Sequence, residues 1–177
     1  LDHDGVWDIK DPLIHARVGG AYLCHRLAGV RAIRGQHPDW VSNRDLTDIE
    51  VRPKTKDCVI VAGALDVDPY TGERLEFTKA EASKVQIDHV IPLSLAWQMG
   101  AARWDTDKRV AFANDPLNLV AVDGPTNGSK SDKSIASWLP PNKSVRCSYA
   151  MRMAQVSLRY DLPTTPADKD VMLAQCS

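Results

Sequence analysis

Two adjacent residues, Asp88 and His89, stand at the end of a short alternating run of apolar residues. Hydrolysis of a phosphodiester needs an activated water, a cation that stabilises the developing charge, and groups that hold the phosphate in line. A carboxylate oxygen suits a hard cation such as Mg²⁺, and an imidazole with a pKa of ~6.5 can take a proton from water. Neighbours on a strand point to opposite faces, so these two share a site only if the strand bends or ends there. Pro92 favours such an end.

Two asparagines and a lysine downstream extend this set. Asn127 is expected near the start of a helix, where its amide oxygen could complete a metal site, because Mg²⁺ often takes only one or two protein ligands. Asn118 begins the next expected strand and could hold the His89 ring, or the loop beside it, through a hydrogen bond. Lys130 lies three residues after Asn127 on the same helix face, placed to meet a phosphate. Each signal alone is weak, since Asp-His pairs are usually structural and such asparagines usually cap helices.

The hydrophobic pattern predicts the elements that position these residues. A strand begins at Val85 and stops before Pro92, and a second strand covers 118–122, followed by a turn at Gly124-Pro125. The helices expected around these strands cover 94–101, 106–114 and 127–138, and a longer helix follows Asn142 with apolar positions at Val145, Tyr149, Met153, Val156 and Tyr160. Strand, connection, strand, helix is therefore the expected order of the core.

Upstream of this core the pattern is less regular. It predicts a helix within 11–27, a short helix over 40–50, a strand over 58–62 and a turn over 68–72. We divide the chain into an N-terminal helical appendage, 1–39, and a domain over 40–177 whose catalytic core spans about 85–138. Trp97, Trp104 and Trp138 are expected to anchor the core rather than to stack on bases.

Composition sets few limits on function. The chain has 177 residues, 44% of them apolar, and a net charge of −1. No apolar run approaches the roughly 20 residues of a membrane-spanning helix, so no membrane association is expected. The basic residues are unevenly placed: the segment 126–160 contains six of them and a single acid, Asp132, for a local charge of +5. Such a segment could attract phosphate, although a solvated helix face is the commoner explanation.

Three stretches of sequence carry a resemblance to a known family. They read IDHVIPLSLAWQMGA, FANDPLNLVAVDGPTNGSKSDK and WLPPN, and the turn DPYTGE precedes them. Together they closely resemble the HNH nucleases, in the branch found at the C-terminus of GmrSD-type restriction enzymes and in many bacterial secreted nucleases. The similarity covers roughly residues 40–160.

This resemblance implies an α+β fold: a ββα-metal core of a short antiparallel hairpin and a helix, surrounded by further helices. It implies that Asp88 and Asn127 hold one metal ion, that His89 is the general base and that Asn118 supports the histidine. The family pattern often has a histidine where Asn127 stands, and an amide oxygen there favours Mg²⁺ or Mn²⁺ over zinc. The implied activity is largely non-specific cleavage of DNA to 5′-phosphate and 3′-hydroxyl ends, with RNA as an alternative substrate.

Four basic side chains are candidates for binding the substrate phosphates: Lys130, Lys133, Arg44 and Arg103. Nothing in the sequence resembles a recognition helix or zinc finger that would read bases. Two alternatives to a simple nuclease stay open. One is a nuclease toxin held by an immunity or inhibitor protein, and the other is a non-catalytic DNA-binding module that keeps the fold.

The cysteines bear on whether the protein is exported or cytoplasmic. Cys24, Cys58, Cys147 and Cys176 include no Cys-x-x-Cys pair, which argues against a zinc site. Their even number is compatible with two disulfides in a secreted or exported protein, and equally with free thiols in a cytoplasmic one. A bridge from Cys58 to Cys147, or from Cys24 to some partner, is a pairing that the sequence leaves open.

Overall fold

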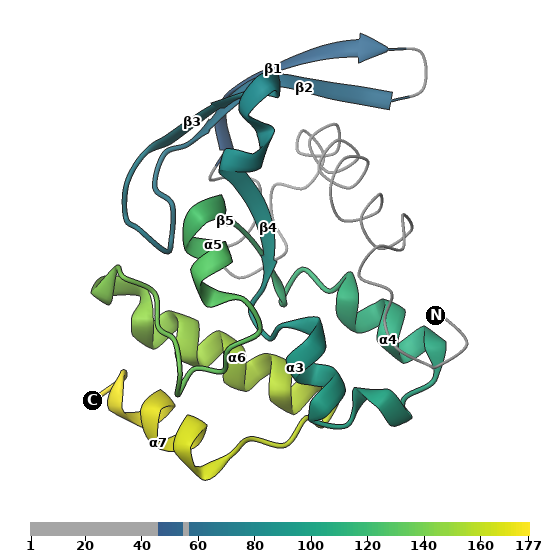
Figure 1. Ribbon diagram of the computed structural model, residues 1–177, viewed down its shortest axis with the longest axis vertical. Helices are drawn as coiled ribbons and strands as arrows, with labels where there is room; N and C mark the ends of the chain where they lie inside the picture. Colours follow the sequence, from purple (N-terminus) through teal and green to yellow (C-terminus); the bar gives the residue numbers. More distant parts are fainter. Residues whose placement is uncertain (1–45, 55–56) are drawn as a thin grey trace, which may run out of the picture.

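The computed structural model describes residues 46–54 and 57–177, with side chains described from Ala62 onward except at Lys79 and Ala82. The expected appendage over 1–39, and Arg44 with it, lie outside the described residues. Within the described part the fold is α+β, as expected: a three-stranded sheet, a two-stranded sheet and five α-helices (Figure 1). None of these helices is long and apolar enough to cross a membrane.

The centre of the domain is a two-stranded antiparallel sheet followed directly by a helix. β4 (Val85–His89) pairs with β5 (Leu119–Asp123). In this register Asp88 lies opposite Val120 and His89 lies opposite Leu119. The helix α5 (Gly124–Lys130) follows β5 without a loop. The expected strand, strand, helix order of the core is therefore confirmed.

The helix α5 begins three residues earlier than predicted and ends at Lys130, well short of Trp138. It starts early because the Asp123 carboxylate caps it by accepting from the Thr126 amide at 2.8 Å. Gly124 is required at the first position, since a Cβ there would lie 2.2 Å from the carbonyl oxygen of Ser83. The helix ends because Ser131 has a φ of 52°, which leaves the helical region.

The connection between the two strands is helical, close to the prediction. It contains α3 (Leu93–Gln98), a 3₁₀ turn (Ala101–Arg103) and α4 (Thr106–Ala113). The first helix ends before residue 101 because Gly100 has a φ of 126°, a value that no helical residue adopts.

A second sheet precedes this unit. β1 (Leu46–Lys54) and β2 (Asp57–Leu65) form a hairpin, and β3 (Leu75–Thr78) pairs with the other edge of β2. The strand predicted over 58–62 is confirmed, but the helix predicted over 40–50 is wrong where it is described, since 46–50 is strand. The backbone of β1 pairs with β2 from Leu46 to Lys54, and this ladder outweighs a weak local helical pattern.

The long amphipathic helix closes the core. α6 (Arg146–Tyr160) buries Tyr149, Met153, Val156 and Tyr160, four of the five apolar positions that the periodicity predicted. The fifth, Val145, is half-buried in the 3₁₀ turn that precedes the helix. The four buried residues pack with residues of the ββα unit and its connection, among them Val90, Ile91, Phe112 and Val122. Trp104 and Trp138 pack against this cluster, as expected, whereas Trp97 is half-buried and lies under the guanidinium of Arg109, 5.6 Å from its ring centroid. Figure 1 shows α3, α6 and α7 (Pro166–Ala174) grouped beyond one end of β4, with the three-stranded sheet beyond the other.

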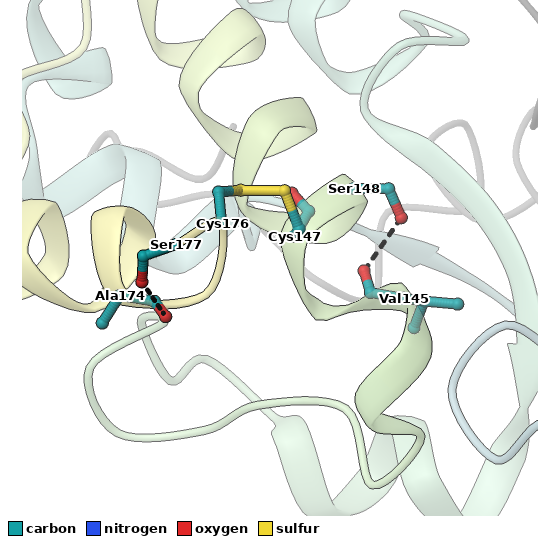
Figure 2. Close-up of a disulfide and its surroundings, with 6 residues drawn as sticks. All are labelled: Val145, Cys147, Ser148, Ala174, Cys176 and Ser177. Atoms are coloured by element: carbon teal, nitrogen blue, oxygen red, sulfur yellow. Dashed lines mark hydrogen bonds between the residues drawn. A yellow bond between two sulfur atoms is a disulfide. The ribbon is translucent and has the colours of Figure 1, made fainter.

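A disulfide links Cys147 to Cys176, with their Cα atoms 4.7 Å apart (Figure 2). It joins the first turn of α6 to the chain just after α7, across a separation of 29 residues. The pairing of Cys58 with Cys147 is therefore wrong. The sequence could not show this, because only the packing of α7 beside α6 brings Cys176 close to Cys147.

Replacing both bridge residues, Cys147→Ser and Cys176→Ser, is expected to lower the free energy of unfolding. A bridge closing a loop of this size contributes about 3 kcal/mol, mainly by restricting the unfolded chain. Guanidinium denaturation of the double variant and the wild type measures the loss. Ser177→Ala, a change beside the bridge, is the control and should leave the midpoint in place. An unchanged midpoint in the double variant would contradict this role.

Candidate active site

The carboxylate of Asp88 lies at the centre of a buried polar cluster. Only 6% of Asp88 is exposed, and the Nζ of Lys130 donates to both carboxylate oxygens at 2.8 Å. The hydroxyl of Tyr70 donates to Oδ2 of the same carboxylate. A buried charge of this kind is stable only when it is paired and hydrogen-bonded. Strand β4, helix α5 and the turn that carries Tyr70 therefore meet at one side chain.

Lys130 is not placed as the sequence analysis expected. Its side chain is fully buried and also donates to the backbone oxygen of His89 at 2.7 Å. Three acceptor atoms thus surround the three donor protons of one ammonium group. In this arrangement Lys130 cannot meet a phosphate from solvent, because Asp88 and His89 occupy its donors. Burial lowers the pKa of Lys130, whereas the charge and hydrogen bonds of Asp88 raise it.

Tyr70 is a site residue that the sequence analysis missed. It lies in the turn over 68–72, where Asp68 is fully buried and accepts from the backbone amide of Thr71 at 2.8 Å. The other oxygen of Asp68 accepts from the amide of Asp123 at 3.0 Å, which fixes the turn to the end of β5. Burial and the neighbouring Asp88 charge raise the pKa of Tyr70, so its hydroxyl stays a donor. The sequence feature that could have identified Tyr70 is the DPYTGE turn, because a tyrosine is not needed to form such a turn.

His89 lies on the opposite face of β4 from Asp88. Its Nε2 is 2.9 Å from the carbonyl oxygen of Ala113, at the end of α4. Since a carbonyl only accepts, this contact assigns the proton to Nε2 and leaves Nδ1 as the acceptor. Burial lowers the pKa of His89, and the Ala113 hydrogen bond and the Asp88 charge partly oppose this. The result is a neutral imidazole with an oriented basic nitrogen.

Asn118 holds the chain that follows His89. It is fully buried, and its side chain accepts from the amide of Ile91 at 2.8 Å and donates to the carbonyl of the same residue at 3.2 Å. Of the two contacts that the sequence left open, the structure therefore shows the loop and not the ring. The backbone oxygen of Asn118 also accepts from Val90 at 2.8 Å. These three bonds fix where β4 ends.

A buried arginine holds Asn118 in turn. Arg152 of α6 donates to the backbone oxygens of Pro116 at 2.6 Å and Leu119 at 3.0 Å, and also to that of Leu117. It is 3% exposed. No sequence pattern distinguishes Arg152 from the other basic residues of its helix.

Asn127 lies on the face of α5 that covers β4. Its Nδ2 donates to Oε1 of Gln86 at 2.9 Å. Gln86 is two residues before Asp88, so both side chains lie on the same face of β4. Lys130 lies on the same face of α5 as Asn127, as predicted. Within the described part of the chain nothing bonds Oδ1 of Asn127. The amide thus keeps one hard oxygen without a hydrogen-bond partner among the described residues.

These residues fit a divalent cation in the chemistry of their donors. Oδ2 of Asp88 already accepts two hydrogen bonds, but Oδ1 accepts only that from Lys130 and keeps a lone pair. Asn127 would supply the second oxygen. Among the described residues no three His, Cys, Asp or Glu side chains gather into a metal site, so the acidic ligand would be Asp88 alone. Two oxygens and several waters are a set that Mg²⁺ accepts.

The remaining candidate phosphate contacts are scattered. Arg103 and Lys133 are exposed, and Lys133 donates to the backbone oxygen of Ser129 at 2.6 Å. The +5 segment does not form a free basic face, because Lys130 and Arg152 are buried and Arg159 pairs with Asp115 at 3.3 Å. Three of the six basic side chains counted in the sequence are therefore held by other residues of the protein and are not free to bind phosphate.

Comparison with known proteins places the chain in a family. A family model of the C-terminal domain of GmrSD restriction endonucleases matches residues 36–175, a longer stretch than the resemblance noted from the sequence. A protein of the fungus Arthroderma benhamiae, described as an uncharacterized secreted protein, is 37% identical over 153 residues, which cover 78% of this chain and 71% of the relative. The family match includes Tyr70, Asp88, His89, Asn118 and Asn127. The chain belongs to the family of the C-terminal domain of GmrSD restriction endonucleases, a nuclease family.

Proposed function

We propose that this domain is a divalent-metal-dependent HNH endonuclease that cuts DNA, with His89 as the general base. The observation that carries the proposal is the contact between Nε2 of His89 and the carbonyl of Ala113 at 2.9 Å. It fixes the tautomer, so that Nδ1 can take a proton from water. The membership of a restriction endonuclease family supports DNA as the substrate.

Each residue of the site then has a task. Asp88 and Asn127 would hold Mg²⁺ or Mn²⁺, and the metal would supply Lewis-acid stabilisation of the charge on the leaving 3′-oxygen. His89 orients the attacking water and accepts its proton while the water oxygen bonds to phosphorus and the bond from phosphorus to the 3′-oxygen breaks. The 3′-oxygen takes a proton from solvent, which gives a 5′-phosphate and a 3′-hydroxyl. Asn118 keeps His89 in register by holding Ile91. Tyr70 and Lys130 hold the Asp88 carboxylate.

Two further findings support export of the protein. The Cys147–Cys176 bridge is a structural disulfide, and such bonds persist in oxidising compartments. The fungal relative is described as secreted. Both support an exported nuclease over a cytoplasmic one.

Replacing His89 with alanine should lower the rate of plasmid cleavage by about 10²- to 10⁴-fold, because the water loses its proton acceptor. Nicking of supercoiled plasmid in Mg²⁺, with linear DNA and RNA in parallel, gives the rate and the substrate preference. Lys169→Ala, an exposed change on α7, is the control and should cleave like the wild type. Wild-type nicking by a folded His89→Ala variant would remove His89 from the mechanism.

Cleavage should stop in EDTA and return when Mg²⁺ or Mn²⁺ is added. Asn127→Ala should raise the Mg²⁺ concentration needed for half-maximal rate by at least about tenfold, since the metal loses an oxygen ligand. The matched control is Gln86→Ala, which removes the hydrogen-bond partner of Asn127 but leaves its Oδ1. Equal metal requirements in the two variants would exclude Asn127 as a ligand.

A further inference from the structure

The buried ion pair sets the charge of the candidate metal site. The ammonium of Lys130 lies 2.8 Å from each oxygen of Asp88, and both groups are shielded from solvent. Asn127 and Tyr70 bring no charge while Tyr70 keeps its proton. The negative charge that would attract a divalent cation is therefore already balanced by a residue of the protein itself.

This balance has a consequence for metal affinity. A divalent cation is bound tightly when its ligands carry net negative charge, and weakly when they are neutral. A phosphodiester of the substrate carries one negative charge per linkage. It can supply to this site the charge that Lys130 has neutralised.

We propose that Lys130 makes the site dependent on substrate: the divalent cation binds weakly to the free protein and tightly together with the phosphodiester. This inference rests on the proposed function, because it takes Asp88 and Asn127 as the metal ligands. Lys130 is here a positioning residue that acts through Asp88 and touches neither the water nor the scissile bond. Metal and nucleic acid each raise the affinity of the other by the same factor, as linkage requires.

The size of the effect follows from Coulomb's law. A monovalent and a divalent cation about 6 Å apart repel enough to change an affinity about tenfold even at the dielectric constant of water. The effect grows inside a protein, where the effective dielectric constant is lower. Replacing Lys130 by an uncharged residue should therefore tighten metal binding to the free protein by at least about tenfold.

The test measures Mn²⁺ binding directly, by electron paramagnetic resonance of the free ion, with and without a DNA strand. A phosphorothioate strand keeps the backbone charge and resists hydrolysis, and a methylphosphonate strand of the same sequence is uncharged. The variants are Lys130→Met, which removes the ammonium, and Lys130→Arg, which keeps a cation. Tyr70→Phe is the matched control, because it removes another hydrogen bond to Asp88 without changing the charge. Circular dichroism checks that each variant is folded.

The wild type should bind Mn²⁺ at least about tenfold more tightly with the charged strand than with the uncharged one. Lys130→Met should bind Mn²⁺ more tightly without DNA and lose most of the difference between strands. Lys130→Arg and Tyr70→Phe should keep that difference. If Lys130→Met does not fold, Lys130→Gln, which is uncharged but keeps a hydrogen-bond donor for Asp88, takes its place with the same expected result.

Equal Mn²⁺ affinity with the two strands would overturn the inference, as would Lys130→Met binding no more tightly than the wild type. In both cases Mn²⁺ still binds and the proposed nuclease stands. A wild type that binds no Mn²⁺ with either strand would overturn the metal-dependent mechanism itself, and the inference with it.

Discussion

The buried pair of Lys130 and Asp88 is the interaction on which the arrangement of the site depends. One ammonium group on the last residue of α5 joins both oxygens of a carboxylate on β4 and the backbone of His89. Removing one member of such a pair typically costs about 3–5 kcal/mol, because the other charge is left buried without a partner. The pair thus fixes the helix on the strand, and with it the position of Asn127 relative to Asp88.

Around this pair the protein uses polar side chains to fix backbone. Asp68 ties the turn of Tyr70 to the end of β5, Asn118 ties β5 to the segment after His89, and Arg152 ties the start of β5 to α6. Each of these side chains is buried and bonds main-chain groups that are distant in sequence. A short two-stranded sheet is marginally stable by itself, so such anchors are needed to hold its side chains in register.

The two adjacent residues Asp88 and His89 serve the site from opposite faces of one strand. Asp88 faces α5, where a cation would be held, and His89 faces the end of α4, where the Ala113 carbonyl orients its ring. Alternation along a strand separates neighbouring side chains, and in the proposed mechanism it assigns the metal-ligand role to Asp88 and the role of base to His89. The strand β4 ends at His89, three residues before Pro92, as the sequence pattern predicted.

The sequence by itself determined the order of strand, connection, strand and helix, and the buried face of α6. It also determined which residue types suit a metal and a base. These follow from periodicity and side-chain chemistry, which are local properties of the sequence. Only the tertiary structure decided that Lys130 is buried against Asp88, that Tyr70 enters the site and that Cys147 pairs with Cys176. Each of these depends on contacts between segments 18 to 42 residues apart. The strand β1, too, is fixed by its ladder with β2, and a local pattern cannot report that ladder.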